Sequence, residues 1–366
     1  MKIAFVSSGR SIHVKKLANA LVNNGHDVTL FTLPNHTDLI NQFNKKVKII
    51  VLKFGGKIGY YLNVPTLRKK LITGKFDLIN CHYISGYGTL TRLANVHPIV
   101  ASVFGSDVYD YPYRSKQNMA RIIKNLNSAR IITSTSQVMV DKVQEYYKNR
   151  KPIYVTHFGI DTNLFKPLPV DSSESEKNAF VFGIVKKIED KYGVGLLIEA
   201  FNEFIKNDSE KKCKLIIYGK GSKENEYIEL VKKLNMQEYI HFRGYINNEK
   251  VPQVLHKINV VCLPSILDSE SFGVAAVEAM ACAKPLIVSN ASGFTEVVDS
   301  SCAIIIPKND KKALVDAMER CYQMEKNQLY EMGQNGYNRA VRMFDFSRNI
   351  ETYINSLTKA VIDERN

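Results

Sequence analysis

Two glutamates spaced eight residues apart are the side chains in this sequence best suited to chemistry. Glu270 and Glu278 belong to a small, apolar stretch that follows a strand predicted over residues 258–263 and includes Ser271, Phe272, Gly273 and Val274. With Ser271 as the N-cap of a helix, the two carboxylates would lie roughly 12 Å apart along its axis. The acid/base pair of a glycoside hydrolase needs about 5 to 9.5 Å. The spacing instead suits a nucleotide sugar, with its sugar at one end, its phosphates over the helix N-terminus and its ribose at the other end.

Two lysines follow the strand predicted over residues 179–185. Lys186 and Lys191 lie in the loop at its carboxyl end. A departing diphosphate needs its growing negative charge neutralised by a metal ion, by cationic side chains or by helix amides. The sequence has no Asp-x-Asp motif, no histidine cluster and no cysteine pair with metal-ligand spacing. We therefore expect no metal site and a reaction in which the protein's own cations stabilise the leaving group.

The first half of the chain places polar residues at the predicted carboxyl ends of its strands. Ligands of open α/β sheets bind at such ends. We expect Gly9 to let the backbone approach the donor, and the following side chains to face the donor or the acceptor: Arg10, His13, His82 and Asp107. His82 and Asp107 are also catalytic candidates, together with Glu270, Lys186 and Lys191.

Short apolar runs alternate with amphipathic stretches, a pattern typical of β-α units on parallel sheets. The strands predicted in the first half span residues 2–7, 27–32, 47–52, 76–81, 99–104, 129–133 and 153–156, and the clearest helices span 11–24, 113–126 and 136–147. The strands predicted in the second half span residues 179–185, 214–218, 258–263, 286–289 and 303–306, with a terminal helix over 345–362.

A proline- and serine-rich stretch over residues 166–178 separates the two halves and is predicted to be a linker. The pattern predicts an α/β protein with two Rossmann-like domains, residues 1–165 and 179–344, facing each other across a cleft.

Several segments resemble glycosyltransferase family 4, a group of retaining enzymes in the GT-B superfamily. Beside the Glu270–Glu278 segment, they are His157-Phe-Gly159-Ile-Asp161, Gly183-Ile-Val-Lys186, Tyr218-Gly-Lys-Gly221, Phe242-Arg-Gly244, Pro264-Ser265 and Ser292-Gly-Phe-Thr-Glu296. The resemblance is dense over residues 155–300 and looser before them. It implies a GT-B fold, an acceptor-binding first domain, a donor-binding second domain, and a terminal helix (about 345–366) that packs back on the first.

The resemblance also implies roles for the site residues. Glu278 would bind the ribose hydroxyls, Glu270 the donor sugar, and the amides of Phe272 and Gly273 the sugar or phosphate. An arginine and a lysine of the family contact the diphosphate; here Lys186 or Lys187 takes the place of the first and Lys191 that of the second. The implied reaction is retaining, needs no cofactor, and uses a UDP-sugar in preference to a GDP-sugar.

The sequence departs from the family at two positions. Phe104 stands where many relatives have a histidine that contacts the donor sugar, which leaves His82 or Asp107 to replace that contact. Ala283 stands where glycine is usual.

Charge is divided unevenly along the 366 residues. Residues 1–170 contain 24 Lys and Arg against 8 Asp and Glu, and the remaining residues contain 26 against 28. The net charge of +14 therefore comes from the first half. Such a charge suits an anionic membrane surface or a lipid-phosphate headgroup. The segments 67–71 and 111–124, the latter including Arg114, Lys116, Arg121 and Lys124, are candidates for this contact, unless they are ordinary amphipathic helices.

No apolar run is long enough to span a bilayer, and no signal-peptide pattern is present. We therefore expect a cytoplasmic enzyme, peripheral at the inner face of the membrane, that acts on a saccharide or lipid-linked saccharide in surface polysaccharide or lipopolysaccharide synthesis. No nucleic-acid partner is expected. Three alternatives remain: a membrane or nucleic-acid binding module, a sugar phosphorylase of the same fold, and a nicotinamide-dependent oxidoreductase. The last is disfavoured because Tyr218-Gly-Lys-Gly221 lacks the third glycine of the dinucleotide fingerprint.

Overall fold

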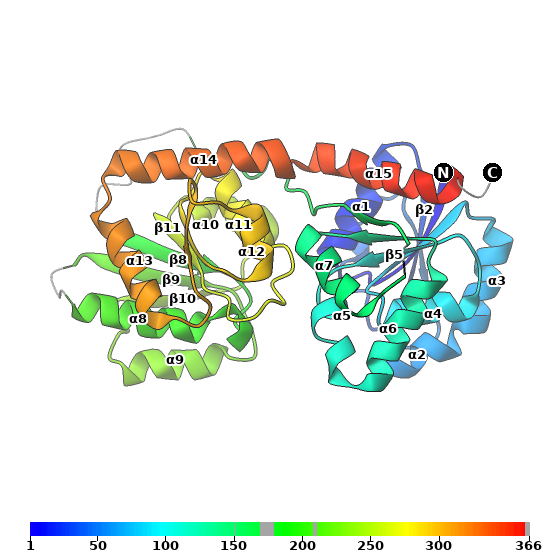
Figure 1. Cartoon of the computed structure of the whole chain (residues 1–366), viewed down its shortest axis with the longest axis horizontal. Helices are drawn as coiled ribbons and strands as arrows, with labels where there is room; N and C mark the ends of the chain where they lie inside the picture. Colours follow the sequence, from blue (N-terminus) through cyan, green and yellow to red (C-terminus); the bar gives the residue numbers. More distant parts are fainter. Residues whose placement is uncertain (150, 169–178, 208–210, 363–366) are drawn as a thin grey trace. The chain divides into compact units, whose positions relative to one another are not determined.

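A computed structural model describes residues 1–149, 151–168, 179–207 and 211–362. The chain divides into two compact units (Figure 1): Met1–Phe158 together with Ser347–Asn366, and Gly159–Phe346. The domains expected from the sequence were residues 1–165 with the terminal helix, and residues 179–344. Most of the linker expected over residues 166–178 lies outside the described residues.

The first unit is built on a parallel sheet of seven strands in the order β3-β2-β1-β4-β5-β6-β7. All seven strands predicted from apolar runs are present: β1 Lys2–Val6, β2 Asp27–Thr32, β3 Lys48–Val51, β4 Leu78–His82, β5 Ile99–Val103, β6 Ile131–Ser134 and β7 Ile153–Val155. The central strands β4 and β5 are buried along their whole length. Burial on both faces explains why they appear in the sequence as continuous apolar runs.

Helices cover both faces of this sheet (Figure 1). They are α1 Ile12–Asn23, α2 Gly56–Leu62, α3 Val64–Gly74, α4 Gly86–Ala94, α5 Ser106–Tyr109, α6 Lys116–Ser128, α7 Gln137–Tyr146 and the terminal α15 Phe346–Ile362, with 3₁₀ turns at Ile40–Gln42 and Pro112–Arg114. Serine N-caps begin α1, α6 and α7. The helix predicted over 113–126 begins later, because Pro112–Arg114 forms the 3₁₀ turn and Ser115 caps the helix proper.

The second unit has a six-stranded parallel sheet in the order β10-β9-β8-β11-β12-β13. The strands are β8 Phe180–Val185, β9 Cys213–Tyr218, β10 Ile240–Gly244, β11 Val260–Leu263, β12 Leu286–Ser289 and β13 Ala303–Ile306. The sequence analysis missed β10 as a strand. It lies at the edge of the sheet, where only its first residue is fully buried, so its apolar pattern is weak.

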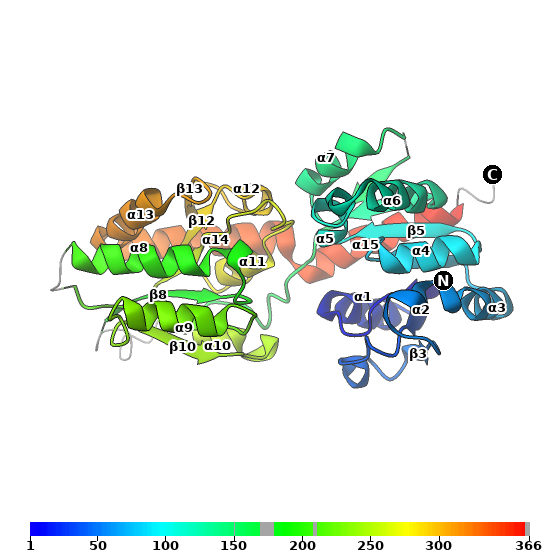
Figure 2. The ribbon, with the colours of Figure 1, turned by 90° about the horizontal axis from the view of Figure 1, so that it is seen from below.

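The helices of the second unit also lie on both faces of its sheet (Figure 2). They are α8 Val194–Lys206, α9 Glu224–Lys233, α10 Val251–Leu255, α11 Val274–Ala281, α12 Ser292–Val297, α13 Lys311–Gln323 and α14 Lys326–Phe344, with 3₁₀ turns at Asp190–Tyr192 and Asn248–Lys250. In both sheets the strand order reverses once, between β1 and β4 and between β8 and β11. These reversals are the points where open α/β sheets bind ligands.

Candidate functional site

The second unit gathers the predicted donor residues at the point where its strand order reverses. β8 and β11 are parallel neighbours, so their carboxyl ends meet at one edge of the sheet. Lys186 directly follows β8, and Glu270 lies in the loop that follows β11. Glu278 is on α11, the helix after that loop.

Lys186 and Glu270 form an ion pair. The lysine Nζ lies 2.7 Å from Oε2 of Glu270, and the two side chains are 14% and 9% exposed. Ser265 donates a second hydrogen bond to the same oxygen over 3.3 Å. Burial alone would lower the pKa of Lys186, but Glu270, Tyr192 and Glu278 together raise it above its usual value. The site therefore keeps this lysine charged at neutral pH, as a phosphate-binding group must be.

The aromatic ring of Tyr192 contacts both predicted lysines. The Nζ of Lys186 lies 4.7 Å from the centre of the Tyr192 ring and that of Lys191 lies 4.9 Å from it. These distances are those of cation–π contacts. Sequence reasoning missed Tyr192; the available signal was an aromatic residue directly after a candidate phosphate-binding lysine.

The loop with these lysines is fixed against the loop that follows β11. Ile266 N donates to the carbonyl of Lys191 over 2.9 Å. Gly193 adopts a positive φ of 70°, and a Cβ there would lie 2.0 Å from the Pro264 carbonyl oxygen. The close approach of the two backbones requires a glycine, and it brings the lysine loop and the glutamate loop together.

Helix α11 begins later than predicted. Its N-cap is Gly273, with a φ of 76°, and its first helical residue is Val274, so the prediction of Ser271 as N-cap was wrong. The reason is that Gly293 N donates to the Glu270 carbonyl over 2.8 Å, which holds the preceding loop against α12. The Phe272 side chain is buried against Phe344. The first amides of the helix, those of Val274 and Ala275, still point out of its N-terminus.

Glu278 is half-buried on α11 and accepts a hydrogen bond from Nδ2 of Asn248 over 2.8 Å. Asn248 lies in the 3₁₀ turn after β10, the strand that sequence reasoning missed. The carboxylate is thereby oriented, and its charge contributes to the raised pKa of Lys186. The two glutamates thus act on the same lysine.

A second ion pair ties the Glu270 loop to the body of the unit. Nζ of Lys308 lies 2.6 Å from Oδ2 of Asp268, and Ser292 donates to Oδ1 of Asp268 through its backbone N (3.1 Å) and its hydroxyl (2.8 Å). Asp268 thus connects the loop before α11 to the start of α12.

His82, predicted as an acceptor and catalytic residue, lies inside the first unit, and that role stays a prediction. Its side chain is fully buried, with Nε2 3.2 Å from the Tyr353 hydroxyl and the ring packed on Phe5 and Phe104. Burial lowers the pKa of His82 to about 3, so the ring is neutral. Tyr353 belongs to the terminal helix α15, whose packing on the first unit accounts for this burial.

Asp107 organises the backbone around it. Its carboxylate is 2% exposed and accepts hydrogen bonds from the N–H groups of Ile84, Phe104 and Gly105 over 2.9 to 3.1 Å. Burial raises its pKa, while these N–H groups act in the opposite direction. With both oxygens engaged, Asp107 holds the loops after β4 and β5 together. Its catalytic and acceptor roles stay predictions.

His13 is part of an aromatic cluster. Its ring stacks on Phe158 with centroids 3.9 Å apart, and Phe104 makes an edge contact with both rings. Burial, with a contribution from Lys16, lowers the pKa of His13 to about 3. Phe104, which replaces the histidine of many relatives, is the centre of this cluster and also contacts Tyr83.

Gly9 and Arg10 lie at the carboxyl end of β1. A Cβ on Gly9 would lie 2.8 Å from the His36 carbonyl oxygen, so packing inside the unit is sufficient to require glycine there. Arg10 is exposed, and its charge acts on His36, Tyr60 and Tyr83. Arg10 is therefore the predicted acceptor residue best able to meet a ligand.

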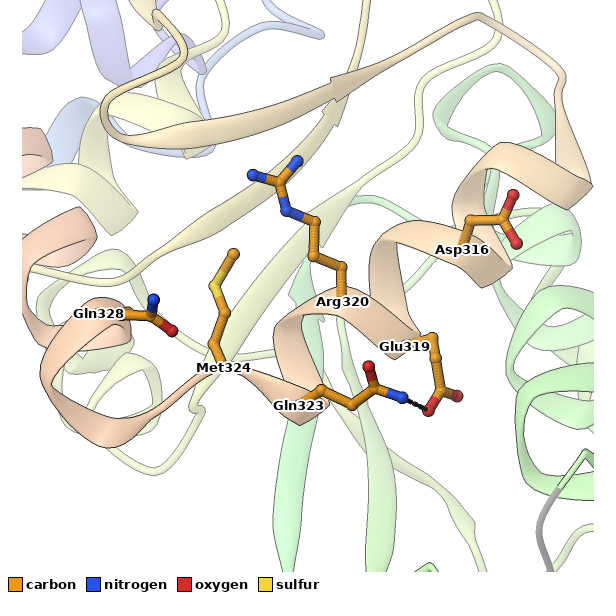
Figure 3. Close-up of a pocket in the computed structure, with 6 residues that line it drawn as sticks. All are labelled: Asp316, Glu319, Arg320, Gln323, Met324 and Gln328. Carbon is orange, nitrogen blue, oxygen red and sulfur yellow. Dashed lines mark hydrogen bonds between the residues drawn. The ribbon is translucent and has the colours of Figure 1, made fainter.

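No group of three or more metal-ligating side chains occurs in the part of the chain that the structure describes. A depression on the surface of the second unit is lined by Asp316, Glu319, Arg320, Gln323, Met324 and Gln328 (Figure 3). Gln323 donates to Glu319 across 2.6 Å there. None of the predicted site residues lines this depression, which therefore has no part in the candidate site.

Two family models match the chain. Residues 169–339 match the glycosyl transferases group 1 model, and residues 2–136 match the glycosyl transferase 4-like model. Together they cover most of the sequence. The family models and the fold show a glycosyltransferase of the GT-B type, and the chain belongs to glycosyltransferase family 4.

Individual proteins agree with this assignment. The chain is 24% identical to D-inositol 3-phosphate glycosyltransferase of Corynebacterium diphtheriae, over 86% of this chain and 81% of that one. Its fold is similar to that of sucrose-phosphate synthase from Thermosynechococcus elongatus, with a TM-score of 0.84, 20% identity and full coverage of both chains. It is also similar to Anabaena HepE in complex with UDP, with a TM-score of 0.82, 19% identity and coverage of 98% and 100%.

Proposed function

We propose that this glycosyltransferase is a retaining, metal-independent enzyme that transfers a hexosyl or N-acetylhexosaminyl group from a UDP-sugar to a saccharide or lipid-linked saccharide. The observation that carries the proposal is the arrangement of Lys186 and Lys191 on the Tyr192 ring, beside the N-terminus of α11. Two cations and a helix N-terminus form a strong site for a diphosphate.

The second unit binds the donor in this proposal. Lys186, Lys191 and the first amides of α11 bind the diphosphate. Glu278, oriented by Asn248, accepts hydrogen bonds from the ribose hydroxyls. Glu270 contacts hydroxyls of the donor sugar in this proposal. Its position is fixed by the hydrogen bond from Gly293 N to its carbonyl and by the ion pair of its carboxylate with Lys186.

The proposed chemical step is a displacement with retention, as the resemblance to family 4 implies. The bond between the anomeric carbon and the diphosphate oxygen breaks, and the acceptor hydroxyl forms its bond to that carbon on the same face. The acceptor proton passes to the leaving diphosphate oxygen. Lys186 and Lys191 neutralise the charge that develops on this group, which lowers the barrier more than it stabilises the bound donor.

The choice of nucleotide is supported by fold neighbours whose structures hold UDP or UDP-glucose, as Anabaena HepE does. The first unit binds the acceptor in this proposal, through the exposed Arg10. The excess positive charge of residues 1–170 supports action at the cytoplasmic face of an anionic membrane in surface polysaccharide or lipopolysaccharide synthesis.

Calorimetric titration with UDP, GDP and ADP in the presence of a chelator tests the donor site. We expect UDP to bind, and Glu278→Ala to weaken it about 10- to 100-fold, since a hydrogen bond to a charged group contributes about 1.5 to 3 kcal/mol. Glu229→Ala, an exposed glutamate of α9, is the matched control. Absence of binding to every nucleoside diphosphate would overturn the donor assignment, and binding of inorganic phosphate alone would favour a phosphorylase.

Two further measurements test the reaction. With the donor sugar identified by a screen, nuclear magnetic resonance of the product gives the configuration at the anomeric carbon, and an inverted centre would refute retention. Activity that needs an added divalent cation after chelation would refute metal independence.

A further inference from the structure

The segment from Leu39 to Phe76 contains no acidic residue. Between Asp38 and Asp77 it has nine cationic side chains: Lys45, Lys46, Lys48, Lys53, Lys57, Arg68, Lys69, Lys70 and Lys75. All nine are exposed, and none forms an ion pair within the described residues. This surface is therefore a concentrated source of positive potential.

The same segment exposes large apolar side chains. Ile58, Tyr61 and Leu62 of α2 are 63%, 47% and 47% exposed, and Ile72 of α3 is 54% exposed. Ile58, Tyr61 and Leu62 have the i, i+3, i+4 spacing that places them on one face of α2. An apolar face surrounded by lysines is typical of a helix that lies in a membrane interface.

The buried side of α2 is firmly attached. Asn63, fully buried between α2 and α3, donates from Nδ2 to the carbonyls of Phe54 and Gly59 over 2.8 Å and accepts from the Phe54 N–H over 3.1 Å. Tyr60, on the inner side, packs edge-on against Tyr87. Both α2 and α3 lie against α4 (Figure 1). The exposed apolar face is thus presented by a fixed support.

The other candidate segment has a different character. In α6, Ile122 and Leu126 are buried, and Arg121 donates to the Tyr111 hydroxyl and to Asn118. Tyr113, just before this helix, is the only large apolar residue of the 111–124 segment with high exposure. The apolar face of α6 is used in the unit's own core, as for an ordinary amphipathic helix.

We infer that the face formed by α2 and α3 docks the enzyme on an anionic lipid bilayer, with Ile58, Leu62 and Ile72 entering the interface and Lys57, Lys69 and Lys70 binding lipid phosphates. The inference deepens the proposed membrane-surface site of action by naming the docking face. A bilayer accounts for the exposed aliphatic side chains, whereas single-stranded nucleic acid is bound by aromatic stacking and cations.

Flotation of the full chain with vesicles tests the inference. Vesicles of phosphatidylcholine alone are compared with vesicles that also contain phosphatidylglycerol, at about 0.1 M and about 0.5 M salt. We expect binding to the anionic vesicles that weakens at the higher salt. Failure of the wild-type chain to bind anionic vesicles would overturn the inference.

Two sets of substitutions separate the apolar and the electrostatic contributions. Ile58→Ser with Leu62→Ser should weaken binding at least about tenfold, from the lost apolar burial. Lys57→Gln with Lys69→Gln and Lys70→Gln should weaken it about 100-fold, because each cation near such a surface contributes about fivefold. The matched controls, Tyr330→Ser for an exposed apolar residue and Lys116→Gln with Lys124→Gln for exposed lysines, should change binding less than twofold.

Other results would overturn the inference. Equal binding by the Ile58/Leu62 variant would mean diffuse electrostatic attraction only. Single-stranded DNA that displaces the protein from vesicles and binds both the wild type and this variant equally would indicate a nucleic-acid surface. Calorimetric binding of UDP, measured on the same variants, is expected to be unchanged. It verifies folding and keeps a failure of docking distinct from a failure of the proposed sugar transfer.

Discussion

The Nζ of Lys186 lies 2.7 Å from Oε2 of Glu270. Lys186 directly follows β8 and Glu270 lies in the loop after β11, and the sheet order reverses between these two strands, so the fold itself brings the cation and the carboxylate together. In the proposed donor complex, a diphosphate at Lys186 would share this lysine with Glu270. The carboxylate raises the pKa of the lysine and fixes the position of its Nζ.

Removal of the charge at Glu270 should change the pH dependence of donor binding. Burial lowers the pKa of Lys186 and Glu270 raises it, so Glu270→Gln should lower this pKa. Because the phosphates need the protonated lysine, the UDP affinity should fall as the pH rises into the alkaline range. In the variant this fall should begin at a lower pH than in the wild type. Calorimetric titration across the pH range measures the shift. Loss of UDP affinity at the same alkaline pH in both proteins would contradict the role given to this ion pair.

The same ion pair affects stability. A lysine whose folded-state pKa is raised stabilises the fold fully below its ordinary value of 10.5 and loses this effect as the pH rises through the folded-state value. In Glu270→Gln this contribution is lost at neutral pH as well. The free energy of unfolding should fall by up to about 3 kcal/mol, as found when one partner of a buried pair is removed.

Tyr192 should act as a positioning residue for the two lysines. Tyr192→Leu removes the ring and should weaken UDP binding roughly 2- to 30-fold, since cation–π contacts contribute about 0.5 to 2 kcal/mol. Tyr192→Phe keeps the ring and should restore most of the affinity. Uridine, which lacks phosphates, provides the control: its binding should be the same in all three proteins. Weakened uridine binding in Tyr192→Leu would indicate a general disruption of the site.

Much of this arrangement could be predicted from the sequence. The strands of both sheets appear as apolar runs, and the polar residues that follow β8 and β11 had to meet because parallel strands end at one edge. The pairing of Lys186 with Glu270 is consistent with that prediction. The role of Tyr192 was missed, because the direction of one ring next to two lysines depends on the local backbone, which Gly193 bends at a positive φ.

The surroundings of His82 and Asp107 could not be predicted, for a different reason, and the catalytic and acceptor roles of both residues stay predictions. Both residues lie at the carboxyl ends of strands, as predicted, but their surroundings come from distant parts of the chain. Tyr353, which contacts His82, is 271 residues away in the sequence, and Ile84, which donates to Asp107, is on another loop. Local pattern identifies the position of such residues, whereas only tertiary packing decides whether they are exposed to a ligand.

Gly293 should be essential for the shape of the donor site. A Cβ there would lie 2.1 Å from the Glu270 carbonyl oxygen and 2.6 Å from the Phe272 nitrogen. Gly293→Ala should therefore displace the loop that holds Glu270, lower the free energy of unfolding by about 1 to 3 kcal/mol and weaken UDP binding. Gly336→Ala, inside α14 and facing only the Met280 side chain and the Cβ of Cys302 at 3.2 Å or more, is the matched control. Unchanged UDP affinity in Gly293→Ala would contradict the inference that the close packing of Gly293 on the Glu270 loop shapes the donor site.

Two neutral histidines should make the first unit sensitive to acid. The pKa values of His13 and His82 are lowered by burial to about 3, whereas both groups have an ordinary value of 6.5 in the unfolded chain. Between these values the unfolded chain binds more protons than the folded one. Stability is therefore fully present above about pH 6.5 and falls as the pH drops toward 3, with a slope of about 1.4 kcal/mol per pH unit for each histidine.

The slope, and not the stability at one pH, is the quantity that tests this explanation. His82→Gln removes one of the two groups. The contribution of the buried histidines to the fall of the unfolding free energy at decreasing pH should therefore be about half as steep, even if the variant is less stable at neutral pH. Denaturant unfolding followed at several pH values between about 4 and 7 measures the slope. His97→Gln, at an exposed position of the same unit, serves as the control and should leave the slope unchanged. An unaltered slope in His82→Gln would mean that burial does not keep His82 neutral in the folded protein, which would contradict this explanation.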